Sequence, residues 1–507
     1  ERGINDRSII VAFMLMLSIC PINMTAAPSD NPNVDENGLA VNIEDGAILH
    51  TWCWSFNTIT ENMQDIAAAG FTAIQCSPVM ECRIGGSGAL TLGNWYYHYQ
   101  ATDYTIGNYQ LGTKEEFKKM CDTAHSLGIK VIVDTVVNHM TASENSIAEY
   151  LRVTSSEQFP NGFLRRPRNT NWSQDNRYEE TQAELSSLRE LNTQDEYVQQ
   201  YIKAFLSECV EAGADGFRYD AAKLIELPDD EPYTDSNGVI HDFASDFWPV
   251  VLNNGATFQY AEDLQEGGHD ATSSRLAAYQ GQFDAVTASF YGWALRDEMI
   301  SKQDLSVDLV SDWRVNTPQV DHQGIVWKDK ESTPGDADYV DVQKIVTWVE
   351  SHDSYCNDAS YRVLDDQEVI LALAIIASRD GGTPLCFSRP MNASASNHWG
   401  DGILGAAGSN MYKDTQVVAV NFFRNEMGDA PEYLSNPNGN TSVLLIERGT
   451  KGGVLINTSD EDVVLDGVEV QAMADGTYPN PAGSGSFTVV DGKIYGTVAA
   501  GRVAVAY

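Results

Sequence analysis

Residues 113–139 read TKEEFKKMCDTAHSLGIKVIVDTVVNH and contain one complete helix-then-strand unit. Thr113 and Glu116 have the spacing of a helix N-cap and its partner, and Gly128 suits a left-handed helix end. The run 129–137 is almost continuously apolar, which is typical of a strand that is buried on both faces. The stretch therefore predicts a helix that packs on the strand following it.

The same unit occurs twice more. One copy starts at Thr58 and another at Thr193, each with a Glu three residues later and a glycine stop, Gly70 or Gly213. Further apolar runs bring the predicted strands to eight: 47–56, 71–77, 129–137, 216–222, 257–262, 285–291, 345–350 and 384–388. Helix-length segments separate them, which predicts a parallel sheet closed into an α/β fold, the (β/α)8 TIM barrel. The alternative, an open doubly wound sheet, lacks its Gly-x-Gly-x-x-Gly turn here.

Two segments depart from this repeat. Residues 140–192, after the third strand, are polar and too long for a structureless loop, so we expect a small inserted domain there. After residue 413, short strands alternate with Gly, Asn, Pro and Asp turns, at 417–421, 442–447, 453–457, 486–490 and 502–507. They predict a C-terminal all-β sandwich over 414–507. The barrel would then comprise 45–139 and 193–413.

The composition limits the function classes and the location. The 507 residues carry 72 acidic and 32 basic side chains, a net charge of −40, which disfavours nucleic acid and anionic membranes as partners. Arg2 and Arg7 precede the apolar run Ser8–Cys20, and small residues follow, so residues 1–27 are expected to be a secretory signal peptide. The run is too short to span a bilayer. We expect a secreted monomer with no stable membrane insertion. Of the eight cysteines, seven follow the signal segment, so at least one is unpaired or bonds another chain.

Polar residues gather where the predicted strands end, at the barrel rim that carries the working groups of such enzymes. They are Asn138, His139, Arg218, Asp220, Lys223, Glu262, His352 and Asp353. Arg218 lies two residues from Asp220 and should lower the pKa of that carboxyl, which suits a nucleophile. Glu262 ends an apolar stretch, which favours the protonated acid and suits a proton donor. Such a pair is what retaining glycoside cleavage requires.

An aromatic run follows the second strand: Trp95, Tyr96, Tyr97 and Tyr99. Aromatic rings at this rim can stack on sugar faces, and equally they can form a packed cluster. The sequence leaves both interpretations open.

Four segments, in this order, resemble the signature regions of the α-amylase family, glycoside hydrolase family 13: DTVVNH at 134–139, GFRYDAAK at 216–223, Glu262 within FQYAEDLQ, and VESHD at 349–353. The similarity runs from about Ile48 to Tyr507 and is strongest to secreted bacterial α-amylases with a small B domain. The resemblance implies that Asp220 is the nucleophile, Glu262 the general acid/base, and Asp353 the acid that stabilises the distorted sugar.

The resemblance also implies substrate contacts. His139 and His352 would hydrogen-bond the sugar at the cleavage subsite, and Arg218 would orient Asp220. Family sugar-binding positions are matched by Tyr96, Tyr99, Gln100 and Lys223. A lysine after Asp-Ala-Ala favours α-1,4 over α-1,6 cleavage. The expected partners are starch, maltooligosaccharides and related α-glucans.

The family's structural calcium lies between the barrel and the inserted domain, so Ca²⁺ is the implied cofactor. Asn138 matches a side-chain ligand and Thr181 a main-chain ligand. This chain departs from the family at two ligand positions: Glu190 stands for an aspartate, and Leu224 for a histidine that supplies its main-chain oxygen. Calcium prefers such oxygen donors.

Three functions follow from these observations. The first is an extracellular endo-acting α-amylase that hydrolyses α-1,4-glucans with retention through a covalent glycosyl-enzyme. The second is a glucan transglycosylase of the same family, because water and sugar acceptors attack the same intermediate. The third is a non-catalytic glucan-binding relative, but such relatives often lose the catalytic carboxylates, and all three are present here.

Overall fold

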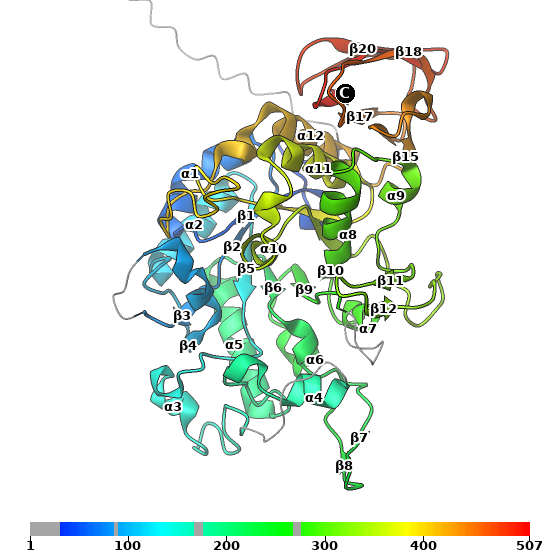
Figure 1. Ribbon diagram of the computed structural model, residues 1–507. Coiled ribbons are helices and arrows are strands. Elements are labelled where there is room, and N and C mark those ends of the chain that lie inside the picture. Colours follow the sequence, from blue (N-terminus) through cyan, green and yellow to red (C-terminus); the bar gives the residue numbers. More distant parts are fainter. Residues whose placement is uncertain (1–30, 86–89, 167–175, 267–274) are drawn as a thin grey trace, which may run out of the picture.

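A computed structural model describes residues 31–85, 90–166, 176–266 and 275–507. The predicted signal peptide, 1–27, lies outside the described residues. Eight parallel strands form a closed barrel in the order β1-β14-β13-β10-β9-β6-β5-β2. Their bounds are β1 Ile48–Thr51, β2 Ala73–Cys76, β5 Lys130–Thr135, β6 Gly216–Tyr219, β9 Phe258–Ala261, β10 Ala285–Thr287, β13 Ile345–Trp348 and β14 Thr383–Phe387. The predicted (β/α)8 barrel is confirmed (Figure 1).

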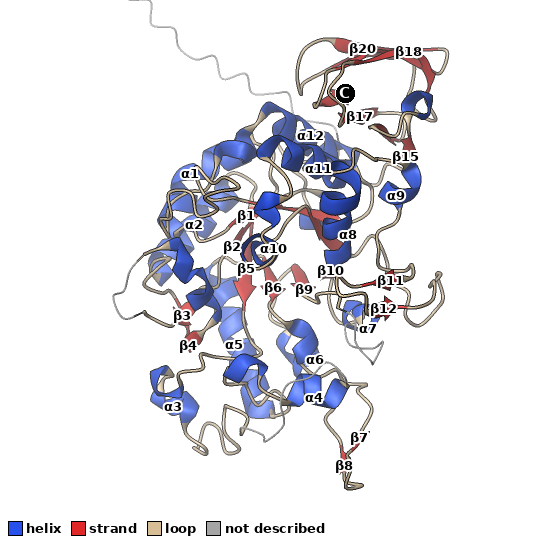
Figure 2. Ribbon diagram, in the orientation of Figure 1, coloured by secondary structure: helices blue, strands red, loops and turns tan. Residues whose placement is uncertain are grey.

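Helices pack around the barrel strands, as Figure 2 shows. The longer ones are α1 Phe56–Ala68, α2 Lys114–Ser126, α5 Glu196–Ala212 and α11 Asp366–Ser378. Shorter helical segments complete the ring: α6 Phe247–Val251, α7 Leu276–Gln280, α8 Ser289–Ala294, η6 Leu295–Ile300 and α9 Val307–Ser311. The barrel strands are buried except at Lys130, the half-buried first residue of β5, so both faces of the sheet are covered.

Helix starts differ in part from the sequence prediction. Thr113 caps α2 through its side chain as predicted, accepting the amide of Glu116 at 3.2 Å. The cap of α1 is instead Ser55, whose hydroxyl accepts the amide of Thr58. The cap of α5 is Asp195 rather than Thr193. Ser and Asp are equally good N-caps, so the Thr-x-x-Glu spacing alone does not select the first residue.

Several smaller elements are inserted between the barrel strands. After β2 come β3 Met80–Cys82, the 3₁₀ helix η2 Leu92–Tyr99 and β4 Ala101–Ile106. Residues 140–192 lie between β5 and α5 and contain η3 Glu144–Ser146, α3 Glu149–Arg152, α4 Arg177–Gln182 and η4 Leu185–Ser187. Three smaller elements follow later: the hairpin of β7 Tyr233–Thr234 and β8 Ile240–His241, η5 Ala222–Leu224, and the pair β11 Gln319–Val320 and β12 Val326–Lys328.

The C-terminal part is a two-sheet sandwich, but it starts later than predicted. Its sheets are β15-β16-β17-β22 and β18-β21-β20-β19. The strands are β15 Glu432–Ser435, β16 Val443–Arg448, β17 Gly452–Asn457, β18 Val463–Glu469, β19 Gly476–Pro479, β20 Ser486–Val490, β21 Lys493–Val498 and β22 Val503–Ala506. The strand predicted at 417–421 is wrong: these residues lie within helix α12, Thr415–Met427. This helix is buried on most sides, and so short an apolar run, Val417–Val420, cannot distinguish a buried helix from a buried strand.

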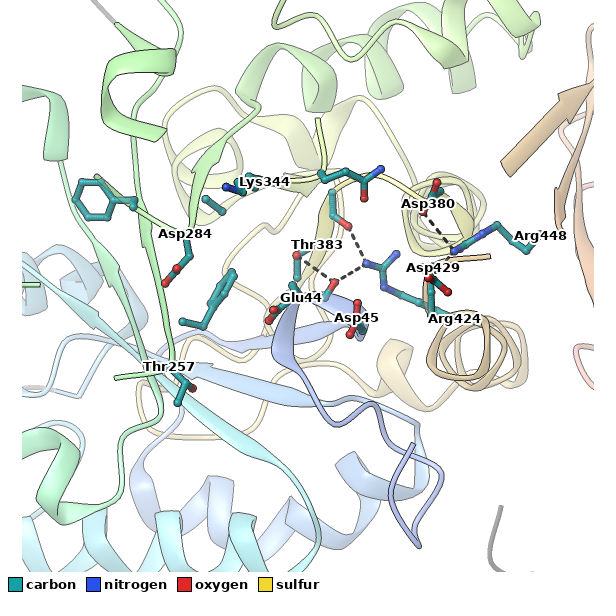
Figure 3. A pocket seen from close by; sticks show the side chains of 16 residues that line it. Glu44, Asp45, Thr257, Asp284, Lys344, Asp380, Thr383, Arg424, Asp429 and Arg448 are labelled. Carbon is teal, nitrogen blue, oxygen red and sulfur yellow. Dashed lines mark hydrogen bonds and ion pairs between the residues drawn. The ribbon is translucent and has the colours of Figure 1, made fainter. Parts of the chain in front are cut away.

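Two buried arginines connect the barrel to the C-terminal part of the chain, Arg448 from the sandwich and Arg424 from α12. Arg448 on β16 donates to the carbonyls of Ser378, Arg379, Gly428 and Ala430 and lies 3.7 Å from Asp380. Arg424 on α12 donates to the carbonyls of Glu44, Gly46, Arg379 and Gly382. Both side chains border a cavity of about 370 Å³ at the N-terminal end of the barrel (Figure 3). This cavity lies at the opposite end from the predicted site residues, and the guanidiniums bordering it already donate to main-chain carbonyls.

All seven cysteines among the described residues are unpaired thiols, and six of them are buried. Burial raises the pKa of Cys82 to about 12, so such thiols stay protonated and inert. In the described part of the chain, no helix has the length and apolar character needed to cross a membrane.

Candidate active site

Arg218 lies at the centre of an acid cluster at the C-terminal end of the barrel. Its Nη1 is 2.8 Å from Oδ1 of Asp134 on β5 and 2.8 Å from Oδ1 of Asp220, and its Nη2 is 2.9 Å from Oε1 of Glu262. Burial would lower the pKa of Arg218, but the three carboxylates raise it well above its ordinary value. One charged guanidinium therefore holds carboxylates from three neighbouring strands within hydrogen-bonding distance.

The turn after β6 ties Asp220 to Glu262. Ala221 is in the left-handed conformation, with φ of 45° and ψ of 39°, which costs a non-glycine residue about 1 kcal/mol. Its amide donates to Oε2 of Glu262 at 2.7 Å, and the amide of Ala222 donates to the carbonyl of Glu262 at 3.1 Å. Such backbone outliers concentrate at functional sites. Here the unusual conformation fixes the end of β6 against the end of β9.

Asp353 comes to the cluster from the first turn of helix α10, His352–Cys356. Ser351 caps this helix and exchanges side-chain hydrogen bonds with Ser354. His352 stacks on Tyr99 with ring centroids 5.3 Å apart and planes 8° apart. A small pocket is lined by Arg218, Glu262, His352 and Asp353 among others. The predicted catalytic acids, which are far apart in sequence, therefore share one site.

The electrostatics of Asp220 differ from the sequence prediction. Arg218 lowers the pKa of Asp220 as predicted, but the net shift is in the opposite direction, and the pKa is raised well above its ordinary value. Burial is the largest cause, and the charge of Glu262 adds to it, so together they outweigh Arg218. Four carboxyls face one guanidinium, so not all of them ionise at once.

Asp353 is a second carboxyl with a raised pKa. Burial, followed by the charge of Glu262, raises the pKa of Asp353 to about 7. The folded state therefore binds this proton more tightly than the unfolded chain, where the ordinary value is 3.8. Because the native state binds more protons between about pH 4 and pH 7, the free energy of unfolding falls as pH rises through this window.

The substitution Asp353→Asn is thus expected to stabilise the protein at neutral and alkaline pH. The difference in melting temperature between variant and wild type should grow between about pH 4 and pH 7 and then level off. Thermal unfolding of both proteins across this range measures it. A difference that does not change with pH would contradict the raised pKa of Asp353. Asp429→Asn is the control, because Asp429 borders the cavity at the opposite end of the barrel.

The substrate-binding positions are only partly assembled around the acids. Tyr99 donates to Oδ2 of Asp134 at 2.7 Å, and His139 is buried, which lowers the pKa of its imidazole to about 4. Gln100 accepts from Thr141 at 3.0 Å, and Tyr96 is exposed on η2. The ammonium of Lys223 is directed elsewhere and donates to the carbonyl of Leu264 and to Oε2 of Glu266.

The aromatic run has two environments. Trp95 packs against Trp52, Tyr99 and His352, with ring centroids 5.7 to 6.0 Å apart. Tyr96 is 39% exposed, so part of its ring is open to a ligand. The run therefore includes a packed cluster beside the acids and one ring at the surface.

The four predicted calcium positions lie where the inserted segment meets the barrel. His139 and Glu190 form an antiparallel bridge, which places Glu190 beside Asn138, and α4, which carries Thr181, packs against η5, which ends at Leu224. Glu190 is buried, and its Oε1 has no hydrogen-bond partner. Burial raises the pKa of Glu190 to about 8. An unpartnered buried carboxylate oxygen is a chemically suitable cation ligand.

Charged groups of the protein surround this position. Arg165 lies 4.0 Å from Oε2 of Glu190 and 2.6 Å from Oε1 of Glu226. Within the described ranges, no group of three or more His, Cys, Asp or Glu side chains is arranged to hold a metal. A metal ion here would therefore depend on amide and main-chain oxygens besides Glu190.

Asp134 is a site residue for which the sequence predicted no role, although it opens the segment DTVVNH at 134–139. It is fully buried on β5, opposite Arg218 in the strand register, and bonds both Arg218 and Tyr99. The signal was available, because a carboxylate within an otherwise apolar barrel strand requires a partner.

Comparison with known proteins agrees with this geometry. Residues 51–274 match the family model described as "Alpha amylase, catalytic domain". An α-amylase of Butyrivibrio fibrisolvens is 41% identical over 500 residues, covering 94% of this chain and 48% of the relative. An α-amylase of Clostridium acetobutylicum is 34% identical over 509 residues, covering 97% of this chain and 59% of the relative. The chain thus spans about half the length of these relatives.

Solved structures share the fold. α-Amylase I of Eisenia fetida, in a complex of a mutant with maltohexaose, superposes with a TM-score of 0.66 at 18% identity, covering 93% of this chain and 97% of that one. An α-amylase from Geobacillus thermoleovorans, complexed with acarbose, gives 0.63 at 14% identity, covering 92% and 98%.

The barrel, with its carboxylates converging at the C-terminal rim, has the architecture of a glycoside hydrolase. The matched catalytic-domain model and the relatives that align along nearly the whole chain define the family within that class. Residues 51–274 therefore carry the catalytic domain of the α-amylase family, and the chain is similar to α-amylases along nearly its whole length.

Proposed function

We propose that the protein is an endo-acting α-amylase that hydrolyses α-1,4-glucosidic bonds of starch and related glucans with retention of configuration. The observation that carries this proposal is the convergence of Asp220 and Glu262 on Arg218, with Asp353 beside them. The names of the relatives and the glucan ligands of the structural neighbours support the substrate class.

In the first step, a carboxylate oxygen of Asp220 attacks the anomeric carbon of the glucose unit. The bond from this carbon to the glycosidic oxygen breaks, and the proton of Glu262 moves to that oxygen, so that the leaving chain departs as an alcohol. The product of this step is a covalent glycosyl ester on Asp220. Arg218 contacts both acids and keeps them in position as their charges change.

In the second step, Glu262 takes a proton from water, and the water oxygen attacks the same anomeric carbon. The ester bond breaks and Asp220 leaves as a carboxylate, so two inversions give overall retention. His352 and Asp353 line the same pocket as Glu262, and the charge of Glu262 acts on the buried imidazole of His139. These three side chains would hydrogen-bond the sugar that is being distorted. A sugar hydroxyl in place of water would give transfer instead of hydrolysis.

A time course of products from soluble starch, with the anomers followed by NMR, tests this proposal. We expect rapid loss of long chains, release of α-anomeric maltooligosaccharides, and no cyclic products. First appearance of the β-anomer would contradict retention, and release of a single small sugar from chain ends would contradict endo-action. Products longer than the substrate would favour the transglycosylase.

We further propose that Asn138, Glu190 and the main-chain oxygens of Thr181 and Leu224 hold Ca²⁺. The unpartnered oxygen of Glu190 supports this, and the ion would supply a rigid link between the inserted segment and the barrel. The glutamate in place of an aspartate and the nearby Arg165 favour weaker binding than usual in the family.

Removal of calcium is expected to destabilise the protein. A chelator should lower the melting temperature of the wild type by about 5 °C or more, because an ion bound only by the native state stabilises it. The variant Glu190→Gln should melt lower than wild type in calcium and respond less to the chelator. Glu211→Gln, on the exposed side of α5, is the control. An identical melting curve of the wild type with and without chelator would contradict the metal site.

We propose that the protein acts outside the cell, on the basis of the apolar segment Ser8–Cys20 and its flanking residues, and that it acts as a monomer. Activity in the culture supernatant, with a mature N-terminus near Ala27, tests the location. Size-exclusion chromatography with light scattering tests the oligomeric state.

A further inference from the structure

A buried ion pair lies next to the short connection between β13 and α10, the helix that carries Asp353. Glu350 follows β13 and precedes Asp353 by three residues, and Arg389 follows β14. Their exposed fractions are 2% and 5%. Nε of Arg389 is 2.5 Å from Oε1 of Glu350, and Nη2 is 3.1 Å from Oε2. This two-point contact fixes the orientation of the carboxylate as well as its distance.

The pair is connected to three further segments. Ser360, on η7 Ser360–Arg362, donates to Oε2 of Glu350 at 2.7 Å. Arg389 also donates to the carbonyl of Leu364 at 3.0 Å and to Oδ1 of Asp366, at the start of α11, at 3.1 Å. Glu350 therefore joins the ends of two barrel strands to the chain between α10 and α11.

The residue before Glu350 is held from the other side. Arg296 is buried in η6, which has π-helical geometry, and donates to the carbonyl of Val349 at 2.5 Å. π-Helical turns are rare and are frequent at functional sites. Val349, Glu350 and the helix cap Ser351 are thus all fixed immediately before His352 and Asp353.

Buried ion pairs contribute little net stability compared with apolar residues of the same size, because both charges lose their hydration. Two charges buried beneath a catalytic loop therefore point to a requirement for precise geometry. Asp353 touches neither partner, so the pair would act on it through the short connection 350–353.

We propose that Glu350 and Arg389 are positioning residues for Asp353, holding the end of β13 so that this acid meets the sugar in the transition state. The inference rests on the proposed glucan hydrolysis. It assigns to Arg389, which lies outside the acid cluster, a part in setting the rate of that reaction.

The test uses Glu350→Gln, Arg389→Met and the double variant in the full-length protein. Each single variant should lower kcat on soluble starch by about 10- to 100-fold with KM within about threefold of wild type, since small displacements of a catalytic group have effects of this size. Each should also melt at a lower temperature, because it leaves one buried charge unpaired. In the double variant neither buried charge remains, and Asp366, which loses Arg389, has a side chain that is 60% exposed, so the melting temperature should recover while kcat stays low.

Arg424→Met is the matched control, a buried arginine (4% exposed) at the other end of the barrel. It should lower the melting temperature and leave kcat within about twofold. Recovery of kcat together with stability in the double variant would show a merely structural pair and overturn the inference, as would unchanged kcat in folded single variants. If the single variants do not fold, the double variant decides in the same way. A wild type that does not hydrolyse starch overturns the proposed function and this inference together.

Discussion

Asp220→Asn is expected to abolish starch hydrolysis, lowering kcat by about 10⁴-fold or more, because an amide cannot form the glycosyl ester. The contact with Arg218 at 2.8 Å places this carboxylate next to Glu262, where the anomeric carbon must lie between them. Initial rates of reducing-end release from soluble starch measure the effect, with enzyme concentrations high enough to detect residual turnover.

The same variant should fold and gain stability. Asp220 is a carboxyl whose pKa is raised by burial and by its neighbours, so removing its charge relieves repulsion within the cluster. The control is Asp215→Asn, just before the opposite end of β6, where Asp215 accepts the amide of Val131 at 2.8 Å. It should change stability but leave kcat within about twofold. Substantial starch hydrolysis by pure Asp220→Asn would remove Asp220 as the nucleophile.

Glu262→Gln is expected to lower kcat on starch by about 10²- to 10⁴-fold, the usual contribution of a general acid/base. Gln keeps the size of the side chain and one of the two acceptor oxygens, so it can accept from Arg218 or from the amide of Ala221 but not from both. The loss of one such hydrogen bond costs about 1–3 kcal/mol, so the fold should persist. An aryl α-maltooligosaccharide with a good leaving group separates the two steps, because its departure needs no proton. On this substrate the first step should be nearly normal and the second step slow, giving a burst of phenol.

The absence of a burst, with both substrates slowed equally, would assign Glu262 a structural part only. Glu447→Gln is a suitable control, since Glu447 is a buried glutamate in the sandwich that accepts the amides of Gln471, Ala472 and Met473. It should affect unfolding and not the burst.

The sequence predicts the barrel well because its signal is repeated. The three helix-glycine-strand units are local patterns, and with the other apolar runs they give eight parallel strands, which leave few arrangements. The error at 417–421 arises because α12 is buried between barrel and sandwich, so its apolar residues surround the helix instead of forming one stripe. Burial of that kind depends on what packs against the helix, which a local pattern does not contain.

The acids of the site are predictable because each follows an apolar strand, and strand ends of a barrel meet at one rim. The ionisation of Asp220 could not be predicted in the same way, because the prediction considered only one neighbour, Arg218, which is two residues away. In the folded chain Asp220 is buried away from water and Glu262 lies near it, and both effects raise the pKa of Asp220. Lys223 shows the same limit. The motif gives its place in the chain, but Glu266 and Leu264, from the loop after β9, determine where its ammonium points.

The arginine contacts between barrel and sandwich bear on how this chain behaves as a set of modules. Arg448 belongs to the sandwich, but its side chain donates to four carbonyls outside it, two at the end of α11 and two after α12. A chain cut before Glu432 would remove the Arg448 donor from these carbonyls, leaving only that of Arg379 with another arginine donor, Arg424, and would uncover the apolar side of α12. The two parts should therefore melt in a single cooperative transition, and grafting the sandwich onto another barrel would need the matching carbonyl sites to be carried with it.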